Sequence, residues 1–483
     1  MKSDLLRDGL GVLNVGPELF VDSVRAAGTP VAHVEWRPAG DGDPKLAWWL
    51  AQLAGDPGDP AAPGSRIDRA NRAAVERMLA ARAVLADVAL RADEVWPELW
   101  ANGRRTLTHA GAPIPWSRMC DPMRGTMIGA ALYEGWAKTA DEAADRLARG
   151  EMTFIPNHDL GAVGPMSGTI SPSMPLFVVR NPAAGNTAYC NFSEGIGRVL
   201  RFGANGPEVI DRLKWIASVL APAIKTALAA LPEGVDLKAI QSQALLMGDE
   251  VHSRNAAASA LFHMAIGGAL AGSDFDRARA RAALEFVAAN SQFFLNLSMA
   301  ASKAIMDAAH GVEHSSIVTA IARNGVTTAI RVSGLGERWF EAPSETPIGL
   351  YFPGFGQEDA NADLGDSAIC ETAGYGGQSL AASPALVQLV GGSVAEAIAY
   401  TREMYHVTWT RNPVMSLPNL EFAGAPAGID VRKVLDTGIR PVLTTGIAHR
   451  RAGVGQIGAG IVRAPLACFA AALAALAEGL GVA

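Results

Sequence analysis

The order of apolar and polar positions in the N-terminal part of the chain predicts alternating strands and helices. GVLNV at 11–15 is typical of a short buried strand, PELFVDSVRAAG at 17–28 of a helix, and PVAHVEW at 30–36 of a second strand. A helix from about Asp68, the apolar run AVLADVAL, the strand-like RTLTHA from Arg105 and a helix from about Asp121 to Trp136 continue the alternation. The pattern predicts a Rossmann-like, doubly wound α/β domain over residues 1–145.

The pattern changes twice after this point. Short strands with proline and glycine turns fill about 151–203, long helical periodicity dominates 207 to about 310, and strands return with SSIVTAIARNG and TTAIRVSG. We therefore expect an α/β and α+β multidomain protein. Its second unit is an α+β domain with glycine-rich loops, formed by 146–206 and 311–483, and a mainly helical segment at 207–310 is inserted into it.

Composition narrows the functional classes. The net charge of −7 provides no general electrostatic attraction to nucleic acid or to an anionic membrane. Acidic and basic residues near the start interrupt any signal-peptide core, and the apolar segment from Ala464 to Leu476 is too short for a membrane span. The four cysteines are far apart in the sequence and show no zinc-finger spacing. These features predict a cytoplasmic protein with neither nucleic-acid nor membrane partners.

One short segment concentrates groups that can transfer protons or hold anions. LLMGDEVHSRN contains Asp249, Glu250, His252, Arg254 and Asn255 within a chain that is only 18% charged. A helix opening at Gly248 would place Asp249 beside His252, which is a general-base arrangement, and would pair Glu250 with Arg254. Two alternatives remain open. The segment could be an exposed helix start with an ordinary ion pair, or its carboxylates and histidine could ligate a divalent metal.

Further candidates stand at predicted strand ends and beside glycines. In a doubly wound sheet, strand ends and helix N-termini bind ligands, which indicates Asn14, Gly16 and His109. Arginine beside glycine suits capture of a carboxylate or phosphate. The remaining candidates from the residues themselves are His158, Arg124, Arg201, Arg323, Asn324, Asp366, Glu371 and Thr372.

Some familiar catalytic motifs are missing from the sequence, and others fail in context. No G-x-S-x-G elbow, P-loop or H-E-x-x-H helix occurs. GVGQIG at 453–458 matches a dinucleotide-binding pattern, but no second strand with an acidic residue follows it. We therefore expect a glycine turn or an anion nest at this segment.

Several distinctive blocks resemble the YlbE-like, FdrA-associated family, formerly a domain of unknown function. They include LTHAGAPIPWSRMCDPMRGTMIGAALYEGWA, GPMSGTISPSMP, EGIGRVLRFG, LLMGDEVHSRN, FFLNLSMAASK, GDSAICETAGYGG and TGIAHRRAGVGQIGAGIV, and the resemblance runs from about Leu10 to Val462. Glu194 and Asn296 lie within these blocks and join the substrate-binding candidates. The resemblance implies a subunit of oxamate carbamoyltransferase, which converts oxalurate and phosphate to oxamate and carbamoyl phosphate in allantoin breakdown, together with an FdrA-type partner.

That reaction needs an anion site, a polarised carbonyl, a carboxylate clamp and an acid for the departing nitrogen. We assign Arg124 and Arg201 to anion binding. His109 or His158 would polarise the carbonyl or act as a general acid. Asp249 with His252 would transfer the proton. Arg254, Arg323 and Asn324 would hold the substrate. No cofactor is required. Two alternatives are an amidohydrolase that opens a ureide with water, and a non-catalytic scaffold of an FdrA-type complex.

These assignments carry a geometric expectation. If the chain has one active site, the blocks around His109, His158, Arg201, Asp249–Asn255, Arg323 and Asp366 should converge on one cleft.

Overall fold

The centre of the molecule is occupied by one helix, α12 (Phe294–Ala309). The computed structural model describes residues 11–34, 38–195 and 197–482. All residues of α12 except Leu295 and Asp307 are buried. Its many alanines and serines let neighbouring backbones approach closely, and it packs against β7, β8, α3, α9 and α13.

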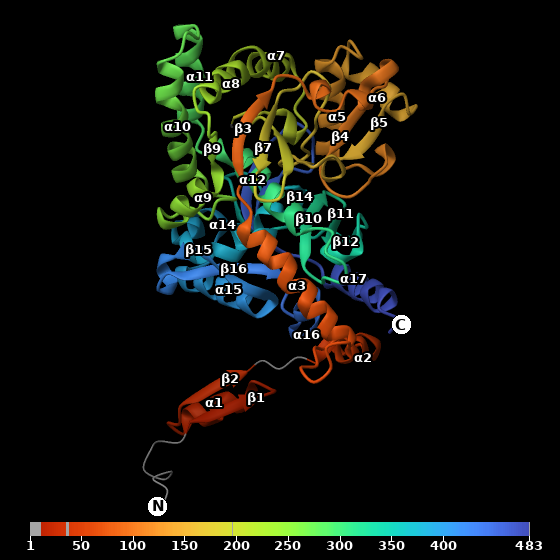
Figure 1. Ribbon diagram of the computed structural model, residues 1–483, viewed down its shortest axis with the longest axis vertical. Coiled ribbons are helices and arrows are strands. Elements are labelled where there is room, and N and C mark those ends of the chain that lie inside the picture. Colours follow the sequence, from red (N-terminus) through yellow and green to blue (C-terminus); the bar gives the residue numbers. More distant parts are fainter. Residues whose placement is uncertain (1–10, 35–37, 196, 483) are drawn as a thin grey trace, which may run out of the picture.

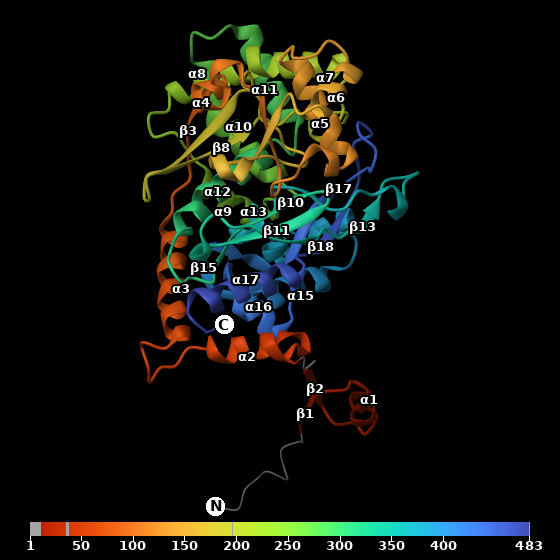
Figure 2. The ribbon, with the colours of Figure 1, turned by 90° about the vertical axis from the view of Figure 1, so that its right-hand side faces the viewer.

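A five-stranded sheet lies against α12 (Figures 1 and 2). Its strand order is β6-β8-β7-β3-β9, and β7 pairs in antiparallel fashion with both β8 and β3. The strands are β3 (Val84–Ala89), β6 (Ala162–Val163), β7 (Leu176–Asn181), β8 (Asn186–Asn191) and β9 (Val235–Asp236).

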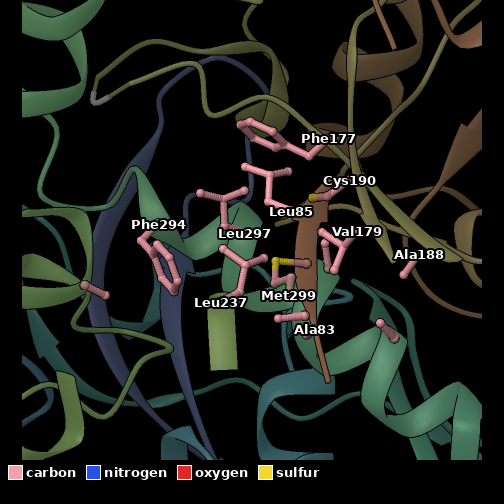
Figure 3. Packing of buried hydrophobic residues seen from close by; sticks show 14 of the residues in the cluster. Ala83, Leu85, Phe177, Val179, Ala188, Cys190, Leu237, Phe294, Leu297 and Met299 are labelled. Carbon is pink, nitrogen blue, oxygen red and sulfur yellow. The ribbon is translucent and has the colours of Figure 1, made fainter. Parts of the chain in front are cut away.

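The core between this sheet and α12 is made of interlocking aliphatic, aromatic and sulfur-containing side chains. Figure 3 shows Leu85, Phe177 and Val179 from the sheet beside Leu297 and Met299 from α12. Each of these five residues is fully buried. The central helix and the sheet are therefore joined mainly by removal of apolar surface from water.

The helical region predicted at 207–310 is present. It contains α7 (Pro207–Trp215), α8 (Ala221–Ala229), α9 (Leu237–Leu246), α10 (Ala256–Ala271), α11 (Arg277–Ala289) and α12, with a π-helical turn at Ile216–Leu220. Among the described residues of this region, the two-residue β9 is the only strand.

A second core forms around the C-terminal helices. It is built on the sheets β12-β11-β10-β14 and β13-β18-β17. Of the buried apolar side chains of the pair β15-β16, Ile429 belongs to it and the others belong to the core around α12. The strands are β10 (Val318–Asn324), β11 (Thr327–Val332), β12 (Phe340–Pro343), β13 (Ile348–Tyr351), β14 (Leu364–Gly365), β15 (Thr408–Leu417), β16 (Ala423–Ile429), β17 (Val442–Ala448) and β18 (Gln456–Arg463).

The helices of this second region cover its sheets. They are α13 (Ile369–Thr372), α14 (Val387–Val390), α15 (Val394–Val407), α16 (Val431–Thr437) and α17 (Leu466–Gly479). The predicted C-terminal helix is thus confirmed as α17. Two N-terminal helices, α2 (Pro44–Gln52) and α3 (Pro63–Ala80), pack beside the C-terminal elements.

A third, smaller core holds α5 (Asp121–Tyr133), α6 (Ala140–Ala148) and the parallel pair of β4 (Thr106–His109) and β5 (Thr153–Pro156). The short α4 (Pro97–Trp100) belongs to a satellite cluster nearby. These three main cores surround the site described below.

The mixed α/β class is as expected. The described strands of residues 1–145, however, do not form a doubly wound sheet. β1 (Val12–Val15) and β2 (Val31–Val34) do form a parallel pair with α1 (Leu19–Ala26) between them. Figures 1 and 2 draw this small unit apart from the rest. β3 and β4 belong to two other sheets, and β3 pairs with strands more than 85 residues later in the chain. Local periodicity predicted the strands, but it carries no information on such distant partners.

The packing of α12 leads to a stability prediction. Leu297→Ala should lower the free energy of unfolding by about 2–5 kcal/mol, because it leaves a cavity at a fully buried position. Urea denaturation followed by circular dichroism measures the loss. The control is Met264→Ala on α10, where the side chain is 75% exposed and the change should stay within about 0.5 kcal/mol. Equal effects of the two substitutions would contradict the central role of α12.

Candidate functional site

A cavity of about 80 Å³ lies where the three main cores meet. Its apolar walls include Met166 and Phe202 from the third core and Leu389 from beside the second. Its polar lining is Arg201, His252, Ser253, Gln292, Ser367 and Gln456. Polar groups that converge on an enclosed space from several elements are a usual feature of a small-molecule site.

The imidazole of His252 is held by a carboxylate from a distant segment. Nδ1 of His252 lies 2.8 Å from Oε1 of Glu371, and the Thr444 hydroxyl oxygen lies 3.2 Å from each of these two atoms. Nδ1 is therefore occupied, and Nε2 is the ring nitrogen available to a ligand in the cavity. Burial alone would lower the pKa of His252, but the charge and hydrogen bond of Glu371 raise it above its ordinary value.

Glu371 is fixed by the backbone around it. Its Oε1 accepts hydrogen bonds from the amides of Gly377 at 3.0 Å and Thr444 at 2.9 Å, while Oε2 is buried without a partner among the described residues. Burial acts to raise the pKa of Glu371, but the nearby charge of His252 and these hydrogen bonds keep it below its ordinary value. The carboxylate is thus an anion placed to orient the imidazole.

Gly376 makes the approach of these two side chains possible. It has φ of 55°, and a Cβ built there would lie 2.1 Å from Oε1 of Glu371 and 3.1 Å from Cβ of His252. Any larger residue would displace the carboxylate from the imidazole.

The segment from Gly248 to Asn255 forms a loop between α9 and α10, which corrects the predicted helix. Gly248 has φ of 93° and Val251 φ of 65°, so the chain leaves helical geometry at both positions. The expected partnership of Asp249 with His252 is therefore replaced by that of Glu371 with His252. The spacing argument therefore named the wrong carboxylate for His252, and the catalytic role of the histidine stays a prediction.

Glu250 stabilises the loop. Its carboxylate accepts from the amides of His252, Ser253 at 2.5 Å and Arg254 at 3.0 Å. Burial raises the pKa of Glu250 to about 7 against the opposing effect of the His252 charge. The predicted side-chain pair of Glu250 with Arg254 does not form, because these amides take up the carboxylate.

Asp249 and Asn255 anchor the two ends of the same loop. Asp249 accepts from the amide of Ala258 at 2.9 Å in the first turn of α10, and its other oxygen lies 3.3 Å from Nε of Arg254. Asn255 donates to the carbonyl of His252 at 2.5 Å and to Gln292 at 3.1 Å. These contacts position His252 from both sides.

Arg201 brings a positive charge to the cavity. Its guanidinium donates to the carbonyl of Gly195 at 2.9 Å, and the Glu194 carboxylate accepts from the backbone amides of Leu200 at 2.5 Å and Arg201 at 3.1 Å. Glu194 thus fixes the loop that carries Arg201, and Arg201 remains a candidate for anion binding.

Arg323 and Asp366 stand behind the cavity wall rather than in it. Arg323 is fully buried, and its Nε donates to Asp363 at 2.7 Å, while Nη2 lies 3.5 Å from the Ser367 hydroxyl. Asp366 accepts from Asn157 at 2.9 Å and from the amides of Gly111 and Gly164, and burial raises its pKa to about 6. Ser367 lines the cavity, follows Asp366 in the chain, and has its hydroxyl within 3.5 Å of Nη2 of Arg323.

Two predicted histidines lie outside this cavity. Nδ1 of His109, at the end of β4, lies 2.9 Å from the carbonyl oxygen of the adjacent Ala110, and burial lowers its pKa. His158 lines a different cleft, and its Nε2 lies 3.6 Å from Oδ1 of Asp366. The expected single cleft therefore contains Arg201 and His252 but neither His109 nor His158.

Other predicted residues have local structural contacts. In the N-terminal unit, Asn14 lies 2.9 Å from His33, and Gly16 adopts φ of 122°. Arg124 donates to the carbonyl of Ser117 and lies over Trp116. The remaining three, Asn296, Asn324 and Thr372, donate to backbone carbonyls at Asn191, Ala112 and Ala368.

The structure adds residues that the sequence prediction missed. Thr444 contacts both members of the His252–Glu371 pair, and Gln292 and Gln456 line the cavity. The GVGQIG segment forms the turn and start of the β17–β18 hairpin, which places Gln456 there. The available sequence signal for Thr444 was its place in a pair of threonines directly before Gly446, between apolar residues.

The proposed metal ligands do not face one point. Asp249, Glu250 and His252 have separate partners, and no group of three or more potential metal ligands occurs in the described parts of the chain. Among the described helices, none combines the length and hydrophobicity needed to cross a bilayer.

Comparisons with known proteins agree with one another. A family model described as oxamate carbamoyltransferase subunit AllG matches residues 152–367. Oxamate carbamoyltransferase subunit AllG of Escherichia coli K12 is 49% identical over 417 residues, which cover 86% of this chain and 99% of that protein. The uncharacterized protein YahG of the same organism is 42% identical over 482 residues, with full coverage of both chains.

A solved structure shows the same fold. The crystal structure of a conserved protein of unknown function from Enterococcus faecalis V583 has a TM-score of 0.83 and 43% identity, and the match covers 86% of this chain and 99% of that one. With 49% identity over 417 residues to a relative that it covers almost completely, the chain belongs to the AllG family.

Proposed function

We propose that the cavity beside His252 carries out the phosphorolysis of a ureido acid as a subunit of a carbamoyltransferase. The observation that supports this most strongly is an imidazole whose Nδ1 is held by Glu371, in a cavity that Arg201 also lines. The name of the 49% identical relative points to the same chemistry. The substrate would be oxalurate, and the products oxamate and carbamoyl phosphate.

The proposed reaction transfers one proton from phosphate to nitrogen. A phosphate oxygen forms a bond to the ureido carbon, and the bond from that carbon to the nitrogen of the departing oxamate breaks. Nε2 of His252 accepts the proton of hydrogen phosphate and delivers it to that nitrogen. Glu371 stabilises the transient imidazolium, since a fixed anion beside the ring favours its charged form.

The remaining lining groups can hold the reactants. Arg201 is suited to phosphate or to the substrate carboxylate, because its planar fork can make two parallel hydrogen bonds. Ser253, Gln292 and Ser367 offer hydrogen bonds to the amide and carbonyl groups of a ureide. No step in this scheme calls for a cofactor. We further propose that the chain works in a complex with an FdrA-type protein in allantoin catabolism.

A second function is supported by the same pair. An imidazole oriented by a carboxylate can activate water as readily as phosphate, which would make the chain an amidohydrolase of a linear or cyclic ureide. The two functions differ in the identity of the nucleophile.

The decisive experiment varies phosphate. Purified chain, alone and with its FdrA-type partner, is incubated with oxalurate, and carbamoyl phosphate is measured by trapping with ornithine and ornithine carbamoyltransferase. We expect product to form in proportion to phosphate at low concentration. Ureide consumption that is independent of phosphate would instead establish the hydrolase. If His252→Ala leaves turnover of the complex unchanged, the cavity is not catalytic and the chain serves as a scaffold.

A second experiment tests the pair itself. His252→Ala should lower turnover by about 10²- to 10⁴-fold, the range typical of general acid–base groups. Glu371→Gln should lower it less and should also shift the pH profile of kcat/KM. The base must be neutral, so activity rises with pH through the pKa of His252, which Glu371 raises. Loss of the anion lowers that pKa, and the acid limb should move to lower pH.

The matched control for these variants is Arg180→Lys, at an exposed position of β7 outside the cavity. Its rate and pH profile should equal those of the wild type. A Glu371→Gln profile that is unshifted, or shifted to higher pH, would show that Glu371 does not tune His252.

A further inference from the structure

A second polar cleft lies beside His158, whose Nε2 is 3.6 Å from Oδ1 of Asp366. It measures about 290 Å³ and is bounded by the short helix Asn157–Leu160, α12, β10 and β11. Its charged lining is Asp159, Lys303, Asp307, Arg331 and Glu337, with His158 and His310. It shares no lining residue with the His252 cavity.

The cations of this cleft are buried, whereas its acids are at the rim. The side chains of Lys303 and Arg331 are 5% and 6% exposed. Those of Asp307, Asp159 and Glu337 are 26%, 36% and 74% exposed. The positive charges are therefore fixed in the floor, while Glu337 and Asp159 can turn into water and be hydrated there.

Rim carboxylates occupy the places that an anion would take. Arg331 contacts Asp159 through Nη2 and Glu337 through Nη1, the latter at 2.8 Å. Lys303 donates to Asp307 at 2.7 Å. An ion pair with a largely exposed carboxylate contributes little, whereas an enclosed oxyanion on a guanidinium makes stronger, charge-assisted hydrogen bonds.

The floor also holds polar atoms without partners. Nε of Arg331 and both ring nitrogens of His158 are buried and have no hydrogen-bond partner in the described residues. Trp339 lies under the guanidinium, 4.3 Å from its Cζ to the ring centroid, which fixes the plane of the fork. Unsatisfied buried donors of this kind call for an acceptor atom.

We propose that this cleft binds a small oxyanion, the carboxylate or phosphate group of a metabolite, on Arg331 and Lys303 in place of Asp159 and Glu337. The site goes beyond the proposed reaction, because it neither shares residues with the His252 cavity nor needs turnover there. His158 lies between the bound anion and Asp366, from which its Nε2 is 3.6 Å away.

The test uses two substitutions with opposite expected signs. Binding of inorganic phosphate and, separately, of acetate to the full chain is measured by isothermal titration calorimetry. Glu337→Gln should tighten binding by about threefold, because it removes an exposed competitor for the guanidinium. Arg331→Gln should weaken binding at least about tenfold, because it removes the buried fork. Whether phosphate or acetate binds more tightly identifies the type of oxyanion.

Two measures separate this site from the proposed reaction. All titrations are made in an Arg201→Gln background, so that anion binding in the His252 cavity is weakened, and Arg180→Gln serves as an exposed control with unchanged affinity. Glu337 is so exposed that its substitution should leave folding intact even if Arg331→Gln does not fold. Unchanged or weaker affinity for both anions in Glu337→Gln would overturn the proposal. Failure of the proposed reaction would appear only as absent carbamoyl phosphate.

Discussion

One carboxylate oxygen, Oε1 of Glu371, joins the parts of the chain that form the main cavity. It receives the His252 imidazole, the amide of Gly377 and the amide of Thr444. Three segments separated by dozens of residues are thereby brought to a single buried atom. Such a charge is tolerated in the interior only because hydrogen bonds and an opposite charge compensate for the lost hydration. Its field in turn makes His252 a stronger base than burial would allow.

Much of the surrounding structure maintains this contact. Gly376 leaves room for the carboxylate of Glu371. Glu250 accepts hydrogen bonds from backbone amides of the loop, and Asn255 donates to the carbonyl of His252. Burial, together with the neighbouring charge of Glu371, raises the pKa of Glu250 to about 7, against the opposing charge of His252. The geometry thus supplies one fixed anion and one oriented imidazole in a cavity bounded by three cores.

Sequence reasoning identified the segment from Asp249 to Asn255 but could not identify its partner. It assumed a helix, in which Asp249 would be the neighbour of His252. The positive φ angles at Gly248 and Val251 break that geometry. Val251 carries no sequence signal for such a conformation, since β-branched residues rarely adopt it. Glu371 was a candidate because of its glycine-rich surroundings. Its contact with His252 is a tertiary contact between residues 119 positions apart in the sequence.

The fold was predictable to a similar extent. Periodicity predicted helices between 207 and 310 and strands near residues 12, 31 and 106, and such elements are present there. The prediction of a doubly wound sheet was wrong, because β3 pairs with β7 and β9. Strand pairing over such sequence distances is decided by which surfaces become buried together. His158 was predicted to share one cleft with His252, but it lines a separate cleft, which only the folded chain reveals.

The most direct test is the titration of His252 itself. The nine histidines are labelled with ¹³C at Cε1, and the resonance of His252 is assigned by its loss in His252→Gln and followed by NMR across the pH range. If Glu371 controls the imidazole, the pKa of His252 lies above 6.5. A pKa at or below 6.5 would show that burial outweighs the carboxylate, and it would contradict the central role of this pair.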